Sequence, residues 1–242
     1  MALIVNEVLR KKPGASHNLE AVANLSAAMT SSQYLYTRMT VAKHLQSSCD
    51  VLDYALSCAT VPGLSLEFGV YSGSSINRTA QQRSGPVYGF DSFDSFDSFD
   101  SFDSFDSFEG LPEGWREGYE KGAFARTDLP PVEPNVELVV GWFDRTLPTF
   151  LDAHPGPVSF LHVDCDLYSS TQTVFTQLRD RIVPGTIILF DEHFNYPGWE
   201  LHEYKAFQKF AVSTGLQYEY IALNLNHQQV AVRVNGYFNR WT

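Results

Sequence analysis

Acidic side chains stand at the ends of two apolar runs in the second half of this chain. Each run, 158–163 and 186–190, has the length and composition of a buried strand. The carboxyl ends of neighbouring parallel strands form the ligand-binding edge of an α/β sheet, so we expect these side chains to face one site. Carboxylates and an imidazole in such a site can accept a proton from a ligand. The residues that follow the two runs are Asp164, Asp166, Asp191, Glu192 and His193.

A second candidate binding element is the stretch 64–77, which reads LSLEFGVYSGSSIN. Its apolar first half predicts a buried strand. Gly69 and Gly73 predict a tight turn, and Ser74 and Ser75 suit the start of a helix. Backbone N–H groups at such a junction point toward a ligand, and the glycines let the ligand approach closely.

An acid in this stretch indicates which ligand is bound. Glu67 stands two residues before Gly69, and the glycine spacing is G-x-x-x-G rather than the G-x-G-x-x-G of dinucleotide sites. A carboxylate there would repel a pyrophosphate, but it would suit a ligand with a free amino group, such as S-adenosylmethionine (SAM). An ordinary strand-to-helix turn accounts for this spacing equally well.

Two later strands carry further candidates for binding such a ligand. The apolar run 87–90 predicts a strand that leads to Asp91, whose carboxylate can accept hydrogen bonds from two ribose hydroxyls. The run 136–143 predicts a third strand that passes through Trp142, which can lie beside an adenine ring or fill the core.

A repeat interrupts the chain after the strand that leads to Asp91. Residues 90–108 read FDSFDSFDSFDSFDSFDSF, with a period of three that fits neither a strand nor an α-helix. Without five units the chain would read VYGFDSFEGLPEGW, an ordinary strand-to-loop connection, so we interpret the repeat as an insertion at about 91–108. Its register leaves Asp91 and Asp106 as candidates for the ribose acid. We favour Asp91 because the strand before it fixes its position.

The order of the predicted elements is typical of an α/β, doubly wound, Rossmann-like sheet. Helical spacing over 31–60 predicts one or two N-terminal helices with a break near 47–50, which form a lid, a dimer surface or a layer packed on the sheet. The runs 216–223 and 229–234 predict an antiparallel pair at the sheet edge. We therefore divide the chain into a helical extension, 1–60, and a ligand-binding domain, 61–242. Further helices are predicted over 76–83, from 146, over 171–182 and over 199–212.

Composition narrows the class of protein. The net charge is −11 with a pI of about 5.0, and no Lys/Arg cluster is present, which argues against a nucleic-acid partner. The three cysteines match no zinc spacing and are typical of reduced thiols in a cytoplasmic protein. The N-terminal sequence MALIVNEVLRKK has too short an apolar run for a signal peptide or a membrane span, so we expect no membrane partner.

Taken together, the motifs resemble those of the class I SAM-dependent methyltransferases, in particular the TylF-like macrocin O-methyltransferase group. The resemblance implies a seven-stranded sheet whose last strand is antiparallel. It also implies that Glu67, Gly69 and Gly73 hold the methionine end of SAM. The motifs that carry it are LEFGVYSGSSI at 66–76, the FDSFEGLP register ending at Pro112, GWFDRTLPTFL at 141–151, HVDCDLYSST at 162–171 and LFDEHFNYPGW at 189–199.

The resemblance also implies a reaction and a set of site residues. Members of this group methylate hydroxyls of sugars or other small molecules, some with a bound Mg²⁺. We expect direct displacement of the methyl group by a substrate oxygen, with Asp164, Asp166 or His193 accepting the proton. The positions that match the metal ligands are Asp164, Asp191 and Glu192. The expected cofactor-binding residues are Glu67, Gly69, Tyr71, Gly73, Ser74, Ser75, Asp91 or Asp106, Trp142 and Asp164.

Two other functions are consistent with parts of the sequence. A catalytically impaired SAM-binding protein would use the Phe-Asp-Ser repeat for self-association, since each buried phenylalanine gains roughly 1.5–3 kcal/mol. A nicotinamide-dependent oxidoreductase would share the fold, but the third glycine of its fingerprint is missing here. For the methyltransferase we expect a homo-oligomer, namely a dimer, that acts on a small-molecule hydroxyl acceptor.

Overall fold

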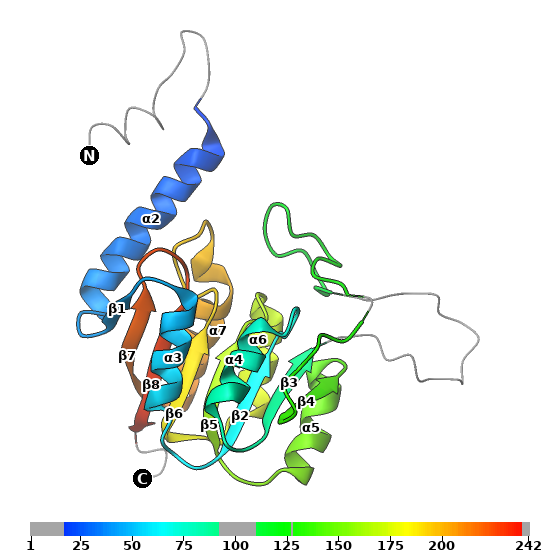
Figure 1. Cartoon of the computed structure of the whole chain (residues 1–242). Coiled ribbons are helices and arrows are strands. Elements are labelled where there is room, and N and C mark those ends of the chain that lie inside the picture. The colour runs from blue at the N-terminus through cyan, green and yellow to red at the C-terminus, as the bar shows by residue number, and fades with distance from the viewer. Residues whose placement is uncertain (1–16, 92–109, 127, 239–242) are drawn as a thin grey trace.

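A mixed sheet runs through the computed structural model of the chain, which describes residues 17–91, 110–126 and 128–238 (Figure 1). Within these residues the sheet has eight strands, in the spatial order β1-β7-β8-β6-β5-β2-β3-β4. Neighbouring strands are parallel except at β8, which is antiparallel to both β6 and β7. The strands are β1 (Lys43–Leu45), β2 (Leu64–Phe68), β3 (Val87–Asp91), β4 (Val136–Val140), β5 (Val158–Val163), β6 (Ile182–Phe190), β7 (Leu216–Asn224) and β8 (Val230–Tyr237).

The predicted α/β class with an antiparallel last strand is confirmed. The described sheet has one strand more than the seven expected, because β1 pairs in parallel with β7 and covers that edge. β8 is therefore an interior strand, and the hairpin of β7 and β8 does not form the edge of the sheet. The three residues of β1 are too few to show a strand period in the sequence.

Helices cover both faces of the sheet (Figure 1). α3 and α4 pack on one face, and α5, α6 and α7 pack on the other. α2 reaches beyond the body of the molecule, and its buried side chains, Ala27, Ser31 and Leu35, belong to its middle and C-terminal turns. The helices are α2 (Leu19–Arg38), α3 (Ser48–Cys58), α4 (Ser74–Gln82), α5 (Phe143–Ala153), α6 (Tyr168–Gln177) and α7 (Glu203–Thr214), with the 3₁₀ turn η1 (Trp199–Leu201) before α7.

Core strands match their predictions more closely than the helices between them. β2 and β5 occupy the predicted residues 64–68 and 158–163. The prediction that a helix runs to residue 182 is wrong, because α6 ends at Gln177 and Ile182 begins β6, which also contains Pro184 and Gly185. They form a bulge there, at which the register between β5 and β6 shifts and Gly185 takes a φ of +94°. α5 begins three residues before the predicted Thr146, and α7 begins four residues after the predicted Trp199.

Two sequence predictions concern residues that the structure does not describe. The insertion expected at about 91–108 lies outside the described residues from position 92 onward, and Asp106 lies there too.

In the part of the chain that is described, no helix has both the length and the apolar character that a membrane crossing requires.

The packing of β3 against α4 leaves no room for a side chain at Gly89. A methyl group there would lie 2.4 Å from Ile76 Cδ1 and 2.8 Å from Val70 Cγ2. We expect Gly89→Ala to lower the free energy of unfolding by about 1–3 kcal/mol through overpacking, as measured by chemical denaturation. Gly85→Ala is the matched control, because its methyl group meets nothing within 4 Å, and it should change stability by only about 0.5 kcal/mol. Equal stabilities of the two variants would contradict this packing.

Candidate active site

A pocket of about 380 Å³ lies at the carboxyl ends of β2, β3, β5 and β6. This is the sheet edge at which the sequence predicted a site, and the loop 110–126 supplies part of the pocket wall. The predicted site residues on the wall are Gly69, Tyr71, Asp91, Trp142, Asp164, Asp166, Asp191 and Glu192. The predicted site residues that are not on the wall are Glu67, Gly73, Ser74, Ser75 and His193.

The glycine turn lies directly against the end of β5. Gly69 has a φ of +91°, and its N–H donates to the carbonyl of Phe90 at 2.9 Å. A methyl group on Gly69 would lie 1.7 Å from the carbonyl oxygen of Asp164. Glycine is therefore required here both for the backbone conformation and for the close contact.

Asp91 ends β3 and holds the same turn. Its Oδ2 accepts hydrogen bonds from the backbone N–H groups of Val70 (2.8 Å) and Tyr71 (3.0 Å). Tyr71, the residue after Val70 in the turn, has a φ of +44° and is half exposed at the pocket. The predicted ribose acid thus lies on the pocket wall and also fixes the shape of the turn.

Glu67 lies beneath the pocket rather than in its wall. The side chain is 1% exposed and accepts hydrogen bonds from Ser75 Oγ (2.7 Å) and His162 Nδ1 (3.0 Å). Burial alone would lower the pKa of His162, but the charge of Glu67 and its hydrogen bond outweigh burial and raise that pKa. Ser75, predicted as a helix cap, is instead the second residue of α4 after Gly73 as N-cap, and it ties this helix to Glu67.

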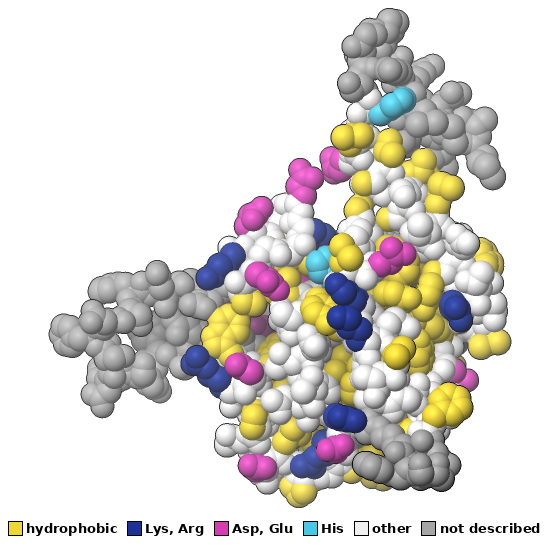
Figure 2. Space-filling model, turned by 180° about the vertical axis from the view of Figure 1, so that it is seen from behind, with side chains coloured by type: hydrophobic (Ala, Val, Ile, Leu, Met, Phe, Trp, Pro, Cys, Tyr) yellow, Lys and Arg dark blue, Asp and Glu magenta, His cyan; other side chains and the backbone are white. Residues whose placement is uncertain are grey.

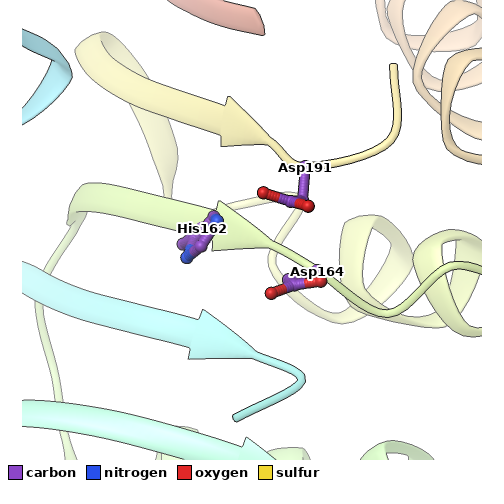
Figure 3. Close-up of side chains that lie close together, drawn as sticks. All are labelled: His162, Asp164 and Asp191. Carbon is purple, nitrogen blue, oxygen red and sulfur yellow. The ribbon is translucent and has the colours of Figure 1, made fainter. Parts of the chain in front are cut away.

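Three potential metal ligands converge beside the pocket floor (Figure 3). One ligand atom each from His162, Asp164 and Asp191 lies within 4.8 Å of the other two. Figure 3 shows the two carboxylates projecting from the ends of β5 and β6, with the His162 ring beside both. Asp191 is held by Gln229, whose Nε2 donates to Asp191 Oδ1 at 3.0 Å. Sequence analysis did not single out His162, because it resembles any other residue inside a buried strand.

Further buried acids surround this cluster. Glu192 is 7% exposed, and its Oε2 has no hydrogen-bond partner among the described residues. Glu203, which sequence analysis missed, is fully buried and accepts a hydrogen bond from the Glu192 N–H at 3.2 Å. Burial, followed by the charges of neighbouring carboxylates, raises the pKa of Asp164, Glu192 and Glu203 well above the usual range. These carboxylates therefore favour a proton or a cation among them.

Asp166 combines burial with an unusual backbone conformation. It has a φ of +60°, which is rare for a residue with a side chain, and it is 7% exposed on the pocket wall. Burial raises the pKa of Asp166 to about 7, against the opposing charge of Arg116 and with a smaller contribution from Asp191. Backbone strain of this kind concentrates at functional sites.

His193 lies away from the pocket. It is fully buried beside Phe190, Tyr204 and Phe207, and its Nε2 shares a hydrogen bond with the Tyr220 hydroxyl at 3.1 Å. Burial lowers the pKa of His193 to about 3. Its position therefore does not support the predicted role as a proton acceptor for a ligand in the pocket.

Comparisons with known proteins agree with this geometry. A family model described as a methyltransferase domain matches residues 66–193, a span that includes the glycine turn and Asp91, Asp164 and Asp191. The fold is similar to that of CalS11, a calicheamicin methyltransferase, with 22% sequence identity, a TM-score of 0.56, and coverage of 95% of this chain and 89% of that chain. It is also similar to that of the O-methyltransferase NovP, with 22% identity, a TM-score of 0.51, and coverage of 76% of this chain and 79% of that chain. No curated protein matches the sequence.

The contact between Gly69 and Asp164 can be tested by substitution. Gly69→Ala should collapse or displace the turn. We therefore expect a clear loss of binding of SAM, the ligand predicted from the sequence, together with a lower melting temperature. Gly156→Ala is the control, because Gly156 also has a positive φ (+120°) but an added methyl group meets nothing within 4 Å. If both variants bind ligand like the original chain, the contact does not shape the pocket.

Proposed function

This chain belongs to the methyltransferase-domain family, and we propose that it transfers a methyl group from SAM to a hydroxyl of a small molecule. The observation that carries this proposal is the pocket at the carboxyl ends of the strands, whose wall combines the glycine turn, Asp91 and Asp166 within the span that matches the methyltransferase domain. Asp166, with a pKa raised to about 7, is suited to take a hydroxyl proton near neutral pH. The resemblance to the TylF-like group supports a sugar or an aromatic natural product as the acceptor.

We assign SAM to the side of the pocket between the glycine turn and Trp142. The methionine end would lie at Gly69 and Tyr71, the ribose at Asp91 and the adenine beside Trp142. In this proposal Glu67 supports the turn from beneath the pocket and does not contact SAM. Its carboxylate already accepts hydrogen bonds from Ser75 and His162. Gly73, Ser74 and Ser75 likewise build the start of α4 and do not contact the ligand directly.

SAM supplies an electrophilic methyl group on a positively charged sulfur. The residues of the chain must align the acceptor oxygen with that group, and alignment of this kind accounts for about 7–11 kcal/mol in intramolecular models. The second task is removal of the hydroxyl proton. We assign it to a carboxylate oxygen of Asp166, which the positive φ and burial hold in one position.

A divalent cation fits the acids beside the pocket floor. We propose Asp164, Asp191 and Glu192 as its ligands. Asp164 and Asp191 belong to the converging group, whereas Glu192 lies outside that group and is proposed because its buried Oε2 lacks a partner among the described residues. Mg²⁺ prefers such oxygen ligands and would lower the pKa of an acceptor hydroxyl. His162 lies close enough to add a nitrogen ligand, which would favour a transition metal instead.

Three finer predictions accompany this proposal: membership of the TylF-like group, assembly as a homodimer and a cytoplasmic location. The alternative function, a catalytically impaired SAM-binding protein that self-associates, depends on the Phe-Asp-Ser repeat. That repeat lies outside the described residues beyond position 91, so this alternative stays a prediction as well.

Calorimetric titration with SAM, followed by transfer assays on hydroxylated acceptors, tests the proposed reaction. Asp166→Asn should retain SAM affinity and lose about 10²–10⁴-fold in rate, because it keeps the shape of the side chain and removes the proton acceptor. For the original chain the rate should rise with pH through about 7, since Asp166 accepts a proton only when it is ionised. Unchanged turnover in Asp166→Asn would refute its role, and failure to bind SAM would refute the proposed function.

The cation ligands are tested separately from SAM binding. Asp191→Ala should abolish activity while SAM still binds, and EDTA should inactivate the original chain until Mg²⁺ or Mn²⁺ is restored. Asp152→Ala is the control, since Asp152 is an exposed acid on α5 outside the pocket wall. Full activity of Asp191→Ala would eliminate the metal-assisted form of the reaction.

A further inference from the structure

Arg116 is the one Lys or Arg on the pocket wall formed by the described residues. Its guanidinium carbon lies 3.7 Å from the Trp115 ring centroid, 5.0 Å from that of Tyr119 and 5.1 Å from that of Tyr196. Within the described part of the chain, the Arg116 side chain makes no hydrogen bond or ion pair. The cation is thus held by aromatic faces, and no described residue uses its donors.

This arrangement is unusual for a pocket that also contains several acids. The charge of Arg116 lowers the pKa of Asp166, although burial of Asp166 outweighs that effect, and the two residues do not form an ion pair. A guanidinium offers five N–H donors in a planar fork that matches the oxygens of a carboxylate or phosphate. The three aromatic rings restrict the guanidinium, so less side-chain freedom is lost when an anion binds.

Further basic side chains extend from Arg116 toward α7. Lys205 Nζ lies 4.9 Å and Lys209 Nζ 5.1 Å from the Tyr168 ring centroid, and neither lysine has a salt bridge with a described residue. His202 lies on the Arg116 side, with its ring centroid 6.3 Å from that of Trp115. Figure 2 shows basic side chains gathered beside a histidine near the middle of the rear face.

The charges around His202 agree with this arrangement. Burial lowers the pKa of His202, and the charges of Arg116 and Lys205 lower it further, which places both cations near one imidazole. The opposing charge is Glu113, whose Oε1 accepts a hydrogen bond from Ser169 at 2.7 Å. In a chain with a net charge of −11, the described pocket wall therefore combines several acids with the single cation of Arg116.

We propose that the methyl acceptor is an anionic molecule whose carboxylate or phosphate group binds the Arg116 fork. The proposal rests on the proposed methyl transfer, and it deepens it by naming the acceptor class. The acceptor hydroxyl would lie at Asp166, and an aromatic or sugar ring between the two ends would contact Trp115. The anionic group itself takes no part in the methyl transfer, so Arg116 is a specificity residue rather than a catalytic one.

The proposal is tested by calorimetric titration of the full chain with inorganic pyrophosphate and, separately, with malonate, in a buffer free of both ions. These two probes distinguish a phosphate from a carboxylate as the preferred group. We expect at least one to bind, and Arg116→Gln should weaken that binding about tenfold or more because it removes a charge-assisted, two-point contact. Arg116→Lys should recover only part of the affinity, since lysine restores the charge without the fork. Lys205→Gln should have a smaller effect.

Arg126→Gln is the matched control on the same loop. Arg126 also lies over an aromatic ring, 5.6 Å from the Tyr71 centroid, but it is not on the pocket wall and pairs with Asp128 at 3.6 Å. The proposal is overturned if neither anion binds the original chain, or if Arg116→Gln binds as tightly as Arg126→Gln. If Arg116→Gln does not fold, Arg116→Lys and Lys205→Gln are compared with Arg126→Gln instead. Anion binding by both variants as tight as that of Arg126→Gln would overturn the proposal.

SAM titration of the same samples separates this proposal from the proposed function. Anion binding without SAM binding would leave the Arg116 subsite standing and refute the methyltransferase reaction. SAM binding without anion binding would refute only the anionic acceptor.

Discussion

Most of the site depends on the buried contact between Glu67 and His162. It joins β2, which leads into the glycine turn, to β5, which leads into the acids, and Ser75 extends the contact to α4. Loss of one partner from a buried charged pair costs about 3–5 kcal/mol, since the other is left uncompensated. The glycine turn and the acids are thus positioned by one polar contact inside an otherwise apolar sheet.

The carboxylates of the site, in contrast to the contact between Glu67 and His162, lower the stability of the fold when they are ionised. Buried carboxylates with raised pKa values favour the protonated state, so ionisation of Asp164, Glu192 and Glu203 lowers the stability of the fold as pH rises. Asp166, the proposed proton acceptor, must likewise be ionised before it can take a proton. Groups that bind there and carry positive charge, such as a cation or the sulfonium of SAM, would offset it.

The sequence predicted the strand ends well, because long apolar runs and glycine turns are local signals. β2, β5 and the positions of Asp91, Asp164 and Asp191 at the sheet edge follow from such runs. The roles of Glu67 and His193 could not be predicted in this way, since whether a side chain faces the pocket or the core depends on packing between elements distant in sequence. Arg116 and Glu203 gave no signal for the same reason. One lies in a loop and the other on an amphipathic helix, where charged residues are ordinary.

The position of β8 has a consequence for the order in which the molecule can assemble. β8 separates β7 from β6, and β1 contacts the sheet only through β7. β1 therefore has no partner strand until residues 216–224 of β7 leave the ribosome, and β7 in turn joins the rest of the sheet only through residues 230–237 of β8. Pairings between such distant segments raise the contact order and slow folding, so residues 43–45 stay without their native sheet contacts during synthesis of nearly the whole chain. The strands β2 to β6 pair with one another and need no segment beyond residue 190 for these pairings.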